Sequence, residues 1–321
     1  MQHKKVVILG TGGTIAGVSS SPASNIEYTA AQLSVDQLIS AVPALACLGE
    51  VVTEQLAQID SKDMSFAVWA ALVTRVQHHL EQDDVQGVVI THGTDTLEET
   101  AYFLQAVLNP RKPVVLTCAM RPANALAADG PQNLLDAVTV AWHAGATGVV
   151  TVCAGLIHSA QDVQKMHTYQ LNAFSSGDAG VIGFIEENGL KLAKNWPLAQ
   201  QIHARAAPEK VALLKDTQSW PIVEIVMSHA GATGRGVEAL VACGARGLVV
   251  AGTGNGSIHH ALEAALLKAQ AAGVRVVRAT RCAQGRVLGK TNDHFPSFDG
   301  LSPVKSRIAL MLQLMNINVA Q

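Results

Sequence analysis

The chain has 321 residues, of which 49% are hydrophobic and 15% charged, and its 23 basic and 25 acidic side chains give a formal net charge of −2. With aromatic residues at only 4% and no basic stripe, nucleic acid is excluded as an expected partner. At about 150 residues per domain, the length predicts two domains, each with a sizeable core.

The first part of the chain alternates short runs rich in Val and Ile with longer helical patterns. Continuous apolar runs of this kind are typical of strands buried on both faces of a parallel sheet. We expect strands at residues 4–9, 51–59, 87–91, 113–117 and 148–153, and helices at 65–81, 96–108 and 131–143. Glu98 and Glu99 suit a first helical turn, and Pro131 suits the first position of its helix.

A hairpin and a linker are expected next. The pair Asn188-Gly189 separates two apolar runs and is a strong turn signal. A second α/β unit follows, with strands at residues 222–227, 247–251 and 274–279 and helices at 236–242, 257–272 and 303–315. The predicted fold is therefore α/β in two domains: a larger N-terminal domain with a mixed or parallel sheet (1–194), a linker (195–215), and a smaller C-terminal domain with a parallel sheet (216–321).

The start of the chain and its cysteines bear on location. The first residues lead directly into an apolar run without a secretory signal, and no stretch approaches the ~20 apolar residues of a membrane span. The cysteines show no C-x-x-C pairing, so we expect reduced, buried thiols. They are Cys47, Cys118, Cys153, Cys243 and Cys282. These features favour a cytoplasmic protein that has no membrane partner.

Two glycine–threonine turns are the most informative feature of the sequence. The first, Gly10-Thr11-Gly12-Gly13-Thr14, follows one expected strand, and the second, Thr91-His92-Gly93-Thr94-Asp95, follows another. Ligands bind beyond the carboxyl ends of parallel strands, so both turns should face one crevice. A hydroxyl beside glycines that expose backbone N–H groups is a plausible centre for acyl transfer.

Several of these residues have more than one interpretation. The first turn resembles a dinucleotide fingerprint, but Ile15 stands where the third glycine is needed, which argues against a nucleotide-dependent oxidoreductase. Asp95 could be a helix N-cap or a catalytic carboxylate. Lys165 could shuttle a proton near Thr94 and Asp95, or be a solvated lysine. His92 is expected to be a structural hydrogen-bonding group rather than a base. No histidine spacing indicates a metal site.

Both turns resemble the two signature motifs of the bacterial-type L-asparaginase/glutaminase family. The resemblance covers nearly the whole chain, because further family blocks follow in order. These blocks are Ala119-Met120-Arg121-Pro122, Ala128-Asp129-Gly130-Pro131-Gln132-Asn133-Leu134, Asp162-Val163-Gln164-Lys165 and Gly254-Asn255-Gly256. The resemblance implies an amidohydrolase that converts L-asparagine to L-aspartate and ammonia through a threonine acyl-enzyme. It also implies no metal or organic cofactor, and a homotetramer with active sites at subunit contacts.

The resemblance assigns roles residue by residue. Thr14 would be the nucleophile, and Tyr28, in a mobile lid over residues 19–31, would help activate it. Thr94, Asp95 and Lys165 would form a second catalytic group. The substrate would be bound by Gly13, Ser61, Lys62, Thr94 and Asp95. Ser61 and Asp95 would hold its α-carboxylate and α-amino groups, and Asn255 would reach into a neighbouring subunit's site.

Two departures from the family pattern concern the α-amino group. Lys62 stands where Gln or Glu usually follows the serine, so a cation replaces a partner of the ammonium. The family's acidic residue from the C-terminal domain has no clear counterpart, with Asp293 the nearest candidate at a poor spacing. We therefore expect weaker binding of asparagine than is usual in the family, or an altered substrate.

Alternatives to an asparaginase remain open on the sequence. Glutamine or another amide could be the preferred substrate, and some glutaminase activity is expected because one methylene discriminates weakly. A non-catalytic amino-acid-binding protein on the same fold would be favoured if Thr14, Tyr28, Thr94 or Lys165 were missing. The family's amidotransferase acting on glutamyl-tRNA normally has an extra N-terminal domain and a tRNA-binding surface.

Overall fold

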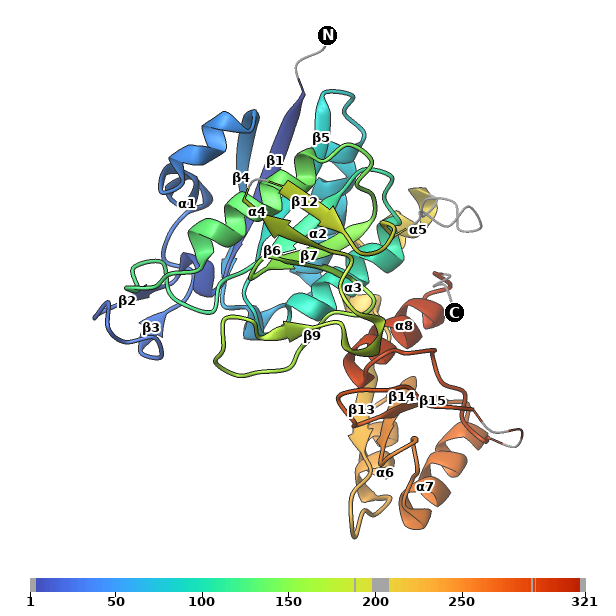
Figure 1. Ribbon diagram of the computed structural model, residues 1–321. Helices are drawn as coiled ribbons and strands as arrows, with labels where there is room; N and C mark the ends of the chain where they lie inside the picture. The colour runs from blue at the N-terminus through green and yellow to red at the C-terminus, as the bar shows by residue number, and fades with distance from the viewer. Residues whose placement is uncertain (1–3, 188, 198–207, 290, 292, 318–321) are drawn as a thin grey trace. The chain divides into compact units, whose positions relative to one another are not determined.

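The computed structural model describes residues 4–187, 189–197, 208–289, 291 and 293–317 (Figure 1). The chain divides into two compact units, residues 1–207 and 208–321. This boundary falls inside the segment 195–215 that was predicted as a linker, most of which (198–207) lies outside the described residues. Trp196 packs against the core of the first unit, and helix α5 (Pro208–Leu213) begins the second.

The first unit is built on a mixed sheet of eight strands, in the order β12-β11-β8-β7-β6-β5-β1-β4. Strands β4, β1, β5, β6 and β7 are parallel, and β8, β11 and β12 continue the sheet antiparallel. The strands are β1 (Lys5–Gly12), β4 (Glu50–Ile59), β5 (Val85–Thr91), β6 (Val114–Thr117), β7 (Val149–Cys153), β8 (Leu156–Ser159), β11 (Gly183–Glu186) and β12 (Gly189–Leu192). The prediction of an α/β fold with a mixed or parallel sheet is confirmed.

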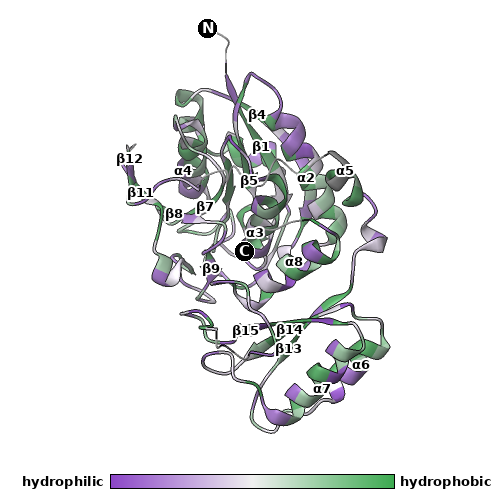
Figure 2. Ribbon diagram, turned by 90° about the vertical axis from the view of Figure 1, so that its right-hand side faces the viewer, coloured by the Kyte–Doolittle hydropathy of each residue, from purple (hydrophilic) through white to green (hydrophobic). Residues whose placement is uncertain are grey.

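Helices cover both faces of this sheet because its central strands are apolar on both sides. Helices α1 (Val35–Ser40) and α4 (Gly130–Trp142) pack on the face that carries Val6 and Ile8. Helices α2 (Phe66–Leu80) and α3 (Leu97–Leu108) contact each other and the sheet, and Trp69 of α2 stacks on Phe103 of α3. Figure 2 shows the hydrophobic central strands in the middle of the unit.

The second unit has a three-stranded parallel sheet in the order β13-β14-β15. Its elements are β13 (Val223–Met227), α6 (Arg235–Ala242), β14 (Gly247–Gly252), α7 (His260–Ala271), β15 (Arg275–Thr280) and α8 (Pro303–Leu314). Each element expected from the sequence is present, with ends displaced by a few residues.

Pro131 in α4 of the first unit is the second helical residue rather than the first, because α4 begins at Gly130.

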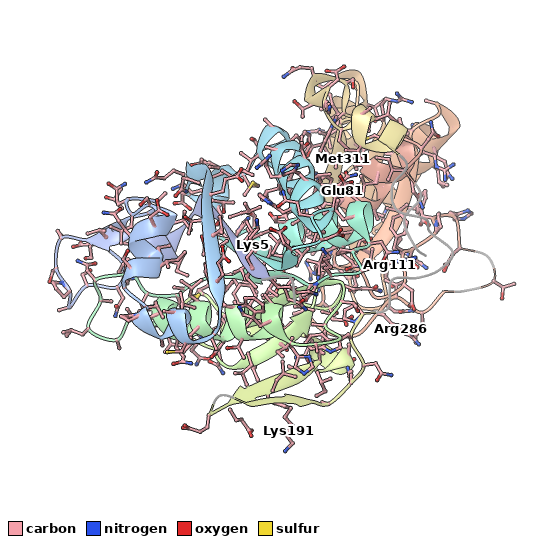
Figure 3. The ribbon with its side chains drawn as sticks, turned by 90° about the horizontal axis from the view of Figure 1, so that it is seen from above. Lys5, Glu81, Arg111, Lys191, Arg286 and Met311 are labelled. Atoms are coloured by element: carbon pink, nitrogen blue, oxygen red, sulfur yellow. The ribbon has the colours of Figure 1, made fainter. Side chains whose placement is uncertain are left out.

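The expected hairpin forms the outer edge of the large sheet. Gly183 to Glu186 of β11 pair antiparallel with β12, and Glu186 faces Gly189 where the turn closes. Asn188 itself lies outside the described residues. The side chain of Lys191 on β12 extends away from the molecule in Figure 3. A lysine on an edge strand discourages pairing with a further strand.

Two further expectations can be compared with the structure. Cys118 and Cys153 are buried as predicted, but the prediction is wrong for Cys47, Cys243 and Cys282, which are exposed. Burial of these three depends on tertiary packing that their neighbours in sequence do not specify. Over the part of the chain described here, none of the helices has the length and apolar character that crossing a membrane requires.

Candidate active site

The two glycine–threonine turns lie against each other at the carboxyl ends of adjacent strands β1 and β5. The hydroxyl of Thr11 donates a hydrogen bond to the carbonyl of Thr91, at 2.8 Å. Gly13 has a φ of +81°, and a Cβ at this position would lie 2.3 Å from the backbone N and Cα of Gly93. The turns can approach this closely only because both positions are glycine. The two turns thus lie together, as two turns that are expected to face one crevice must.

Thr14 is paired with a tyrosine from the segment predicted to be a lid. It begins a short 3₁₀ helix (Thr14–Ala16) and is buried, and its Oγ1 lies 2.7 Å from the Oη of Tyr28. Tyr28 belongs to strand β3 (Tyr28–Thr29), which pairs antiparallel with β2 (Val18–Ser19). Residues 20–27 therefore form the tip of a small hairpin that returns the tyrosine to the first turn.

Thr94, Asp95 and Lys165 form a second cluster. The ammonium of Lys165 donates to Thr94 Oγ1 at 2.7 Å and to Asp95 Oδ1 at 2.6 Å. Lys165 lies on strand β9 (Gln164–Lys165), and its backbone N–H donates to Glu98 Oε2 at 2.8 Å. Only 19% of the Lys165 side chain is exposed, against 53% of Asp95. Lys165 is thus an internal partner of the second turn and not a solvated surface lysine.

Ser61 joins this cluster through the backbone of the second turn. It starts a 3₁₀ helix (Ser61–Asp63), and its Oγ accepts a hydrogen bond from the backbone N–H of Asp95 at 3.1 Å. The hydroxyl of Thr96 donates to the Ser61 carbonyl at 2.7 Å. The hydroxyl proton of Ser61 is thereby left available to donate to a bound anion.

Lys62 is oriented by Asp60. Its Nζ lies 2.8 Å from Asp60 Oδ2, and 64% of the side chain is exposed. The hydrogen bond that Lys62 donates to Asp60 raises the pKa of Lys62, and the charges of Asp60, Asp63 and Asp95 act in the same direction. Lys62 therefore carries a positive charge close to Asp95, and it supplies no acceptor for an ammonium group.

The structure decides two alternatives at the second turn. Thr96, not Asp95, is the N-cap residue of α3, so the N-cap interpretation of Asp95 is wrong. His92 is buried, with Nδ1 2.7 Å from the Gly93 carbonyl and Nε2 2.9 Å from Thr100 Oγ1. Burial lowers the pKa of His92 to about 4, so its imidazole is neutral near pH 7. The prediction of a structural histidine is confirmed.

Two residues considered in the second unit are held by local contacts. The side-chain amide of Asn255 donates to the Leu288 carbonyl at 3.0 Å and accepts from the Leu288 N–H at 2.7 Å. Asp293 forms an ion pair with Arg278. Both carboxylate oxygens of Asp293 are engaged by this guanidinium, which leaves it poorly suited to bind a substrate ammonium.

No role was predicted from the sequence for the residues that fix the loop after β6. The partly buried carboxylate of Asp129 accepts hydrogen bonds from the backbone N–H groups of Met120 and Arg121, both at 2.9 Å. Asn124 exchanges two hydrogen bonds with the backbone of Ser19. Asp129 lies in a recognised block, whereas no local pattern marks Asn124, because its partner is 105 residues away.

The arrangement provides two hydroxyl groups, each hydrogen-bonded to a different side chain that has a proton to donate. Thr14 has the Tyr28 phenol, and Thr94 has the Lys165 ammonium, which is in turn bonded to Asp95. Such pairs can activate an oxygen nucleophile and deliver a proton to a leaving group. Among the residues that the structure describes, no cluster of three His, Cys, Asp or Glu side chains could hold a metal ion.

Comparison with known proteins places these features in context. Residues 5–198 match the family model "Asparaginase, N-terminal", and residues 222–319 match "Glutaminase/Asparaginase C-terminal domain". The chain is similar to L-asparaginase 2 of Bacillus subtilis, with 38% identity over 98% of this chain and 83% of that protein. It is also similar to a glutaminase-asparaginase of Pseudomonas fluorescens biotype A, with 37% identity over 96% and 86%. A crystal structure of a probable cytoplasmic L-asparaginase from Campylobacter jejuni has a TM-score of 0.87 and 37% identity, and covers 97% of this chain and 95% of that one.

Proposed function

Because the chain belongs to the asparaginase/glutaminase family of enzymes, we propose that it hydrolyses L-asparagine to L-aspartate and ammonia through an acyl-enzyme on Thr14, with a secondary activity on L-glutamine. The observation that carries this proposal is the 2.7 Å contact between Thr14 Oγ1 and Tyr28 Oη, on a turn whose Gly13 packs against Gly93 of the turn that carries Thr94 and Asp95. The reaction needs no metal or organic cofactor.

In the first half of the proposed reaction, Thr14 Oγ1 attacks the carbon of the substrate's side-chain amide. Tyr28 accepts the Thr14 hydroxyl proton as it releases its own phenolic proton to solvent, and the Lys165 ammonium gives a proton through Thr94 to the departing nitrogen, which leaves as ammonia. In the second half, water attacks the resulting ester and its proton returns through Thr94 to the Lys165 amine, while Tyr28 takes up a proton from solvent and returns one to Thr14 as L-aspartate is released. Each hydroxyl thus works with the partner that it already contacts.

The substrate's charged groups are assigned to the second turn and to Ser61. The Ser61 hydroxyl donates to the α-carboxylate, since its oxygen already accepts the Asp95 N–H. Asp95 receives the α-ammonium: Lys165 contacts its Oδ1, and the carboxylate is more than half exposed. Gly13 contributes by keeping the two turns close enough for one small molecule to span them.

Lys62 weakens the site for an α-amino acid. Its charge lies close enough to Asp95 to act on it, and it replaces a group that would accept from the ammonium. Loss of one hydrogen bond to a charged group costs about 1.5–3 kcal/mol, which corresponds to roughly 10- to 150-fold in KM. We expect Lys62→Gln to lower KM for L-asparagine; a micromolar KM in the unmodified enzyme that Lys62→Gln leaves unchanged contradicts this.

The proposed assembly is a homotetramer in which Asn255 acts at a neighbouring subunit's site. This proposal is supported by family membership and by the two hydrogen bonds between the Asn255 side-chain amide and the Leu288 backbone, which fix the orientation of that amide. Sedimentation measurements test the assembly, and Asn255→Ala should then lower activity without changing the sedimentation coefficient. A monomer with full activity rejects both statements.

We further propose that the enzyme is cytoplasmic. The Campylobacter jejuni structure, described as a cytoplasmic enzyme, supports this, whereas a similar protein from Haemophilus influenzae is named as periplasmic. Cell fractionation of the native host, with a periplasmic and a cytoplasmic marker enzyme, decides between the two compartments.

Ammonia release from L-asparagine, L-glutamine and D-asparagine tests the reaction. Thr14→Ala should abolish release, while Thr74→Ala, a substitution on the exposed side of α2, should leave it unchanged. Rapid release by Thr14→Ala rejects Thr14 as the nucleophile. No release from any of the three compounds by the unmodified enzyme rejects the substrate assignment, and Lys62 is then the first residue to change.

A further inference from the structure

The hairpin that carries Tyr28 is attached firmly at its base. Asn124 Oδ1 accepts from the Ser19 N–H at 2.8 Å, and Asn124 Nδ2 donates to the Ser19 carbonyl at 2.7 Å. A backbone hydrogen bond adds to this attachment, because Ala123 N–H donates to the Gly17 carbonyl at 2.8 Å. These bonds fix the base to the loop after β6.

The tip of the hairpin, residues 20–27, has two attachments: Leu126 N–H donates to the Pro22 carbonyl at 3.2 Å near its start, and side chains hold it at Asn25. Asn25 Nδ2 donates to Tyr169 Oη at 3.3 Å. Arg121 holds Tyr169 in place, since its guanidinium carbon lies 4.0 Å from the centroid of the tyrosine ring and its Nη1 donates to the Tyr169 carbonyl at 2.9 Å. Stacking of a guanidinium on a tyrosine ring stabilises the ring in one orientation.

We propose that Tyr169, supported by Arg121, is a positioning residue that latches the tip of the lid and so keeps Tyr28 against Thr14. The latch is a single hydrogen bond at the surface, where Tyr169 is 44% exposed, so it can break and re-form far more readily than the base. The lid opens at its tip while Asn124 retains its base.

The position of Tyr169 along the chain gives the latch a further consequence. Tyr169 follows Lys165 by four residues in the loop between β9 and β10 (Phe174–Ser175). Arg121 lies in the loop whose backbone Asp129 fixes. The latch therefore joins the lid, which carries Tyr28, to the segment that carries Lys165, and it closes both proton-transfer pairs around one substrate.

Tyr169→Phe tests the latch because it retains the ring on Arg121 and removes only the hydroxyl. We expect amide hydrogen exchange in residues 20–27 to become about three- to tenfold faster, as for the loss of one hydrogen bond, while exchange in β1 and β5 is unchanged. Tyr102→Phe, in the buried α3, is the matched control and should leave lid exchange as it is. Equal lid exchange in both variants and the unmodified protein overturns the proposal.

The kinetic part of the test rests on the proposed function. For L-asparagine, Tyr169→Phe should lower kcat/KM by about three- to tenfold. Arg121→Lys, which removes the planar stack on the Tyr169 ring, should lower kcat/KM further than Tyr169→Phe does. The control Arg111→Lys should leave kcat/KM unchanged. A structural defect alone would also speed exchange in β1 and β5, and this outcome overturns the positioning role. If no amide is hydrolysed, the exchange measurement still decides the latch, so the two proposals fail separately.

Discussion

Replacement of Gly13 by alanine tests how closely the two turns are held together. The residue has a φ of +81°, where a side chain is strained, and its Cβ would meet the backbone N and Cα of Gly93 at 2.3 Å. Backbone atoms on both sides cannot rotate away, so the turns themselves must separate. Gly145 is the matched control in the same unit, with a φ of +88° and no atom within 4 Å of an added Cβ.

The difference between these two variants measures the contact together with the ψ of Gly13. Both variants strain a residue at positive φ, by about 1–2 kcal/mol, and the ψ of −170° at Gly13 adds to this because that region is essentially confined to glycine. Only Gly13→Ala adds the forced separation, for which overpacking of a core gives about 1–3 kcal/mol. At about 2–4 °C per kcal/mol for a unit of this size, the midpoint of thermal unfolding in Gly13→Ala should lie about 2–12 °C below that of Gly145→Ala.

Calorimetry of the two purified variants measures this difference, and ammonia release measures its effect on the site. Gly145→Ala should retain the activity of the unmodified enzyme, whereas Gly13→Ala should lose most of it because Thr14 is adjacent to the displaced residue. Equal midpoints and equal activities for the two variants would refute the reasoning that the contact with Gly93 holds the site together.

Three other predictions follow from the same structure. Lys165→Met removes both bonds to the second turn and should lower kcat by about 10²–10⁴, with Lys268→Met on α7 as a control; a kcat within threefold of the unmodified enzyme contradicts the proton-transfer role. Because burial lowers the pKa of His92 to about 4 from 6.5, the unfolded chain binds a proton below pH 6.5 that the native chain does not bind. The free energy of unfolding should therefore fall by about 2 kcal/mol more between pH 7 and pH 5 in the unmodified protein than in His92→Gln. Urea unfolding at the two pH values measures this difference. The hydrogen bond from Arg75, with help from His79, lowers the pKa of Glu54 to about 2, so stability that is present above pH 4.5 is lost as pH falls toward 2. In an acid titration, Glu54→Gln should lose less free energy of unfolding over this range than the unmodified protein, and identical titrations of the two proteins reject this prediction.

The sequence predicted the fold class, the parallel strands and most helices because these depend on local patterns. A continuous run such as residues 87–91 is apolar whatever surrounds it, and it forms β5 where expected. Helix α1 was not predicted, although Ser34 and Gln37 form a capping box that marks its start. The small hairpin β2–β3 carries no such signal, since each strand has only two residues.

The candidate site shows the same division between local and long-range information. The two turns could be predicted from the sequence, because glycine and threonine directly after an apolar strand are typical of a ligand-binding turn in an α/β fold. The resemblance supplied Tyr28 and Lys165, and the sequence left open whether Asp95 was a cap and Lys165 a surface lysine. Lys165 lies 70 residues from Asp95, and only the path of β9 brings the two to 2.6 Å.

The strands and turns, and with them the residues available for chemistry, can therefore be read from the amino-acid sequence. Which of these residues meet depends on the tertiary structure: the pairing of Thr14 with Tyr28, the orientation of Lys62 toward Asp60, and the contact of Arg121 with Tyr169. This is because hydrophobic periodicity and glycine conformations act over a few neighbouring residues, whereas contacts between distant side chains form only when the packed sheet fixes their backbones.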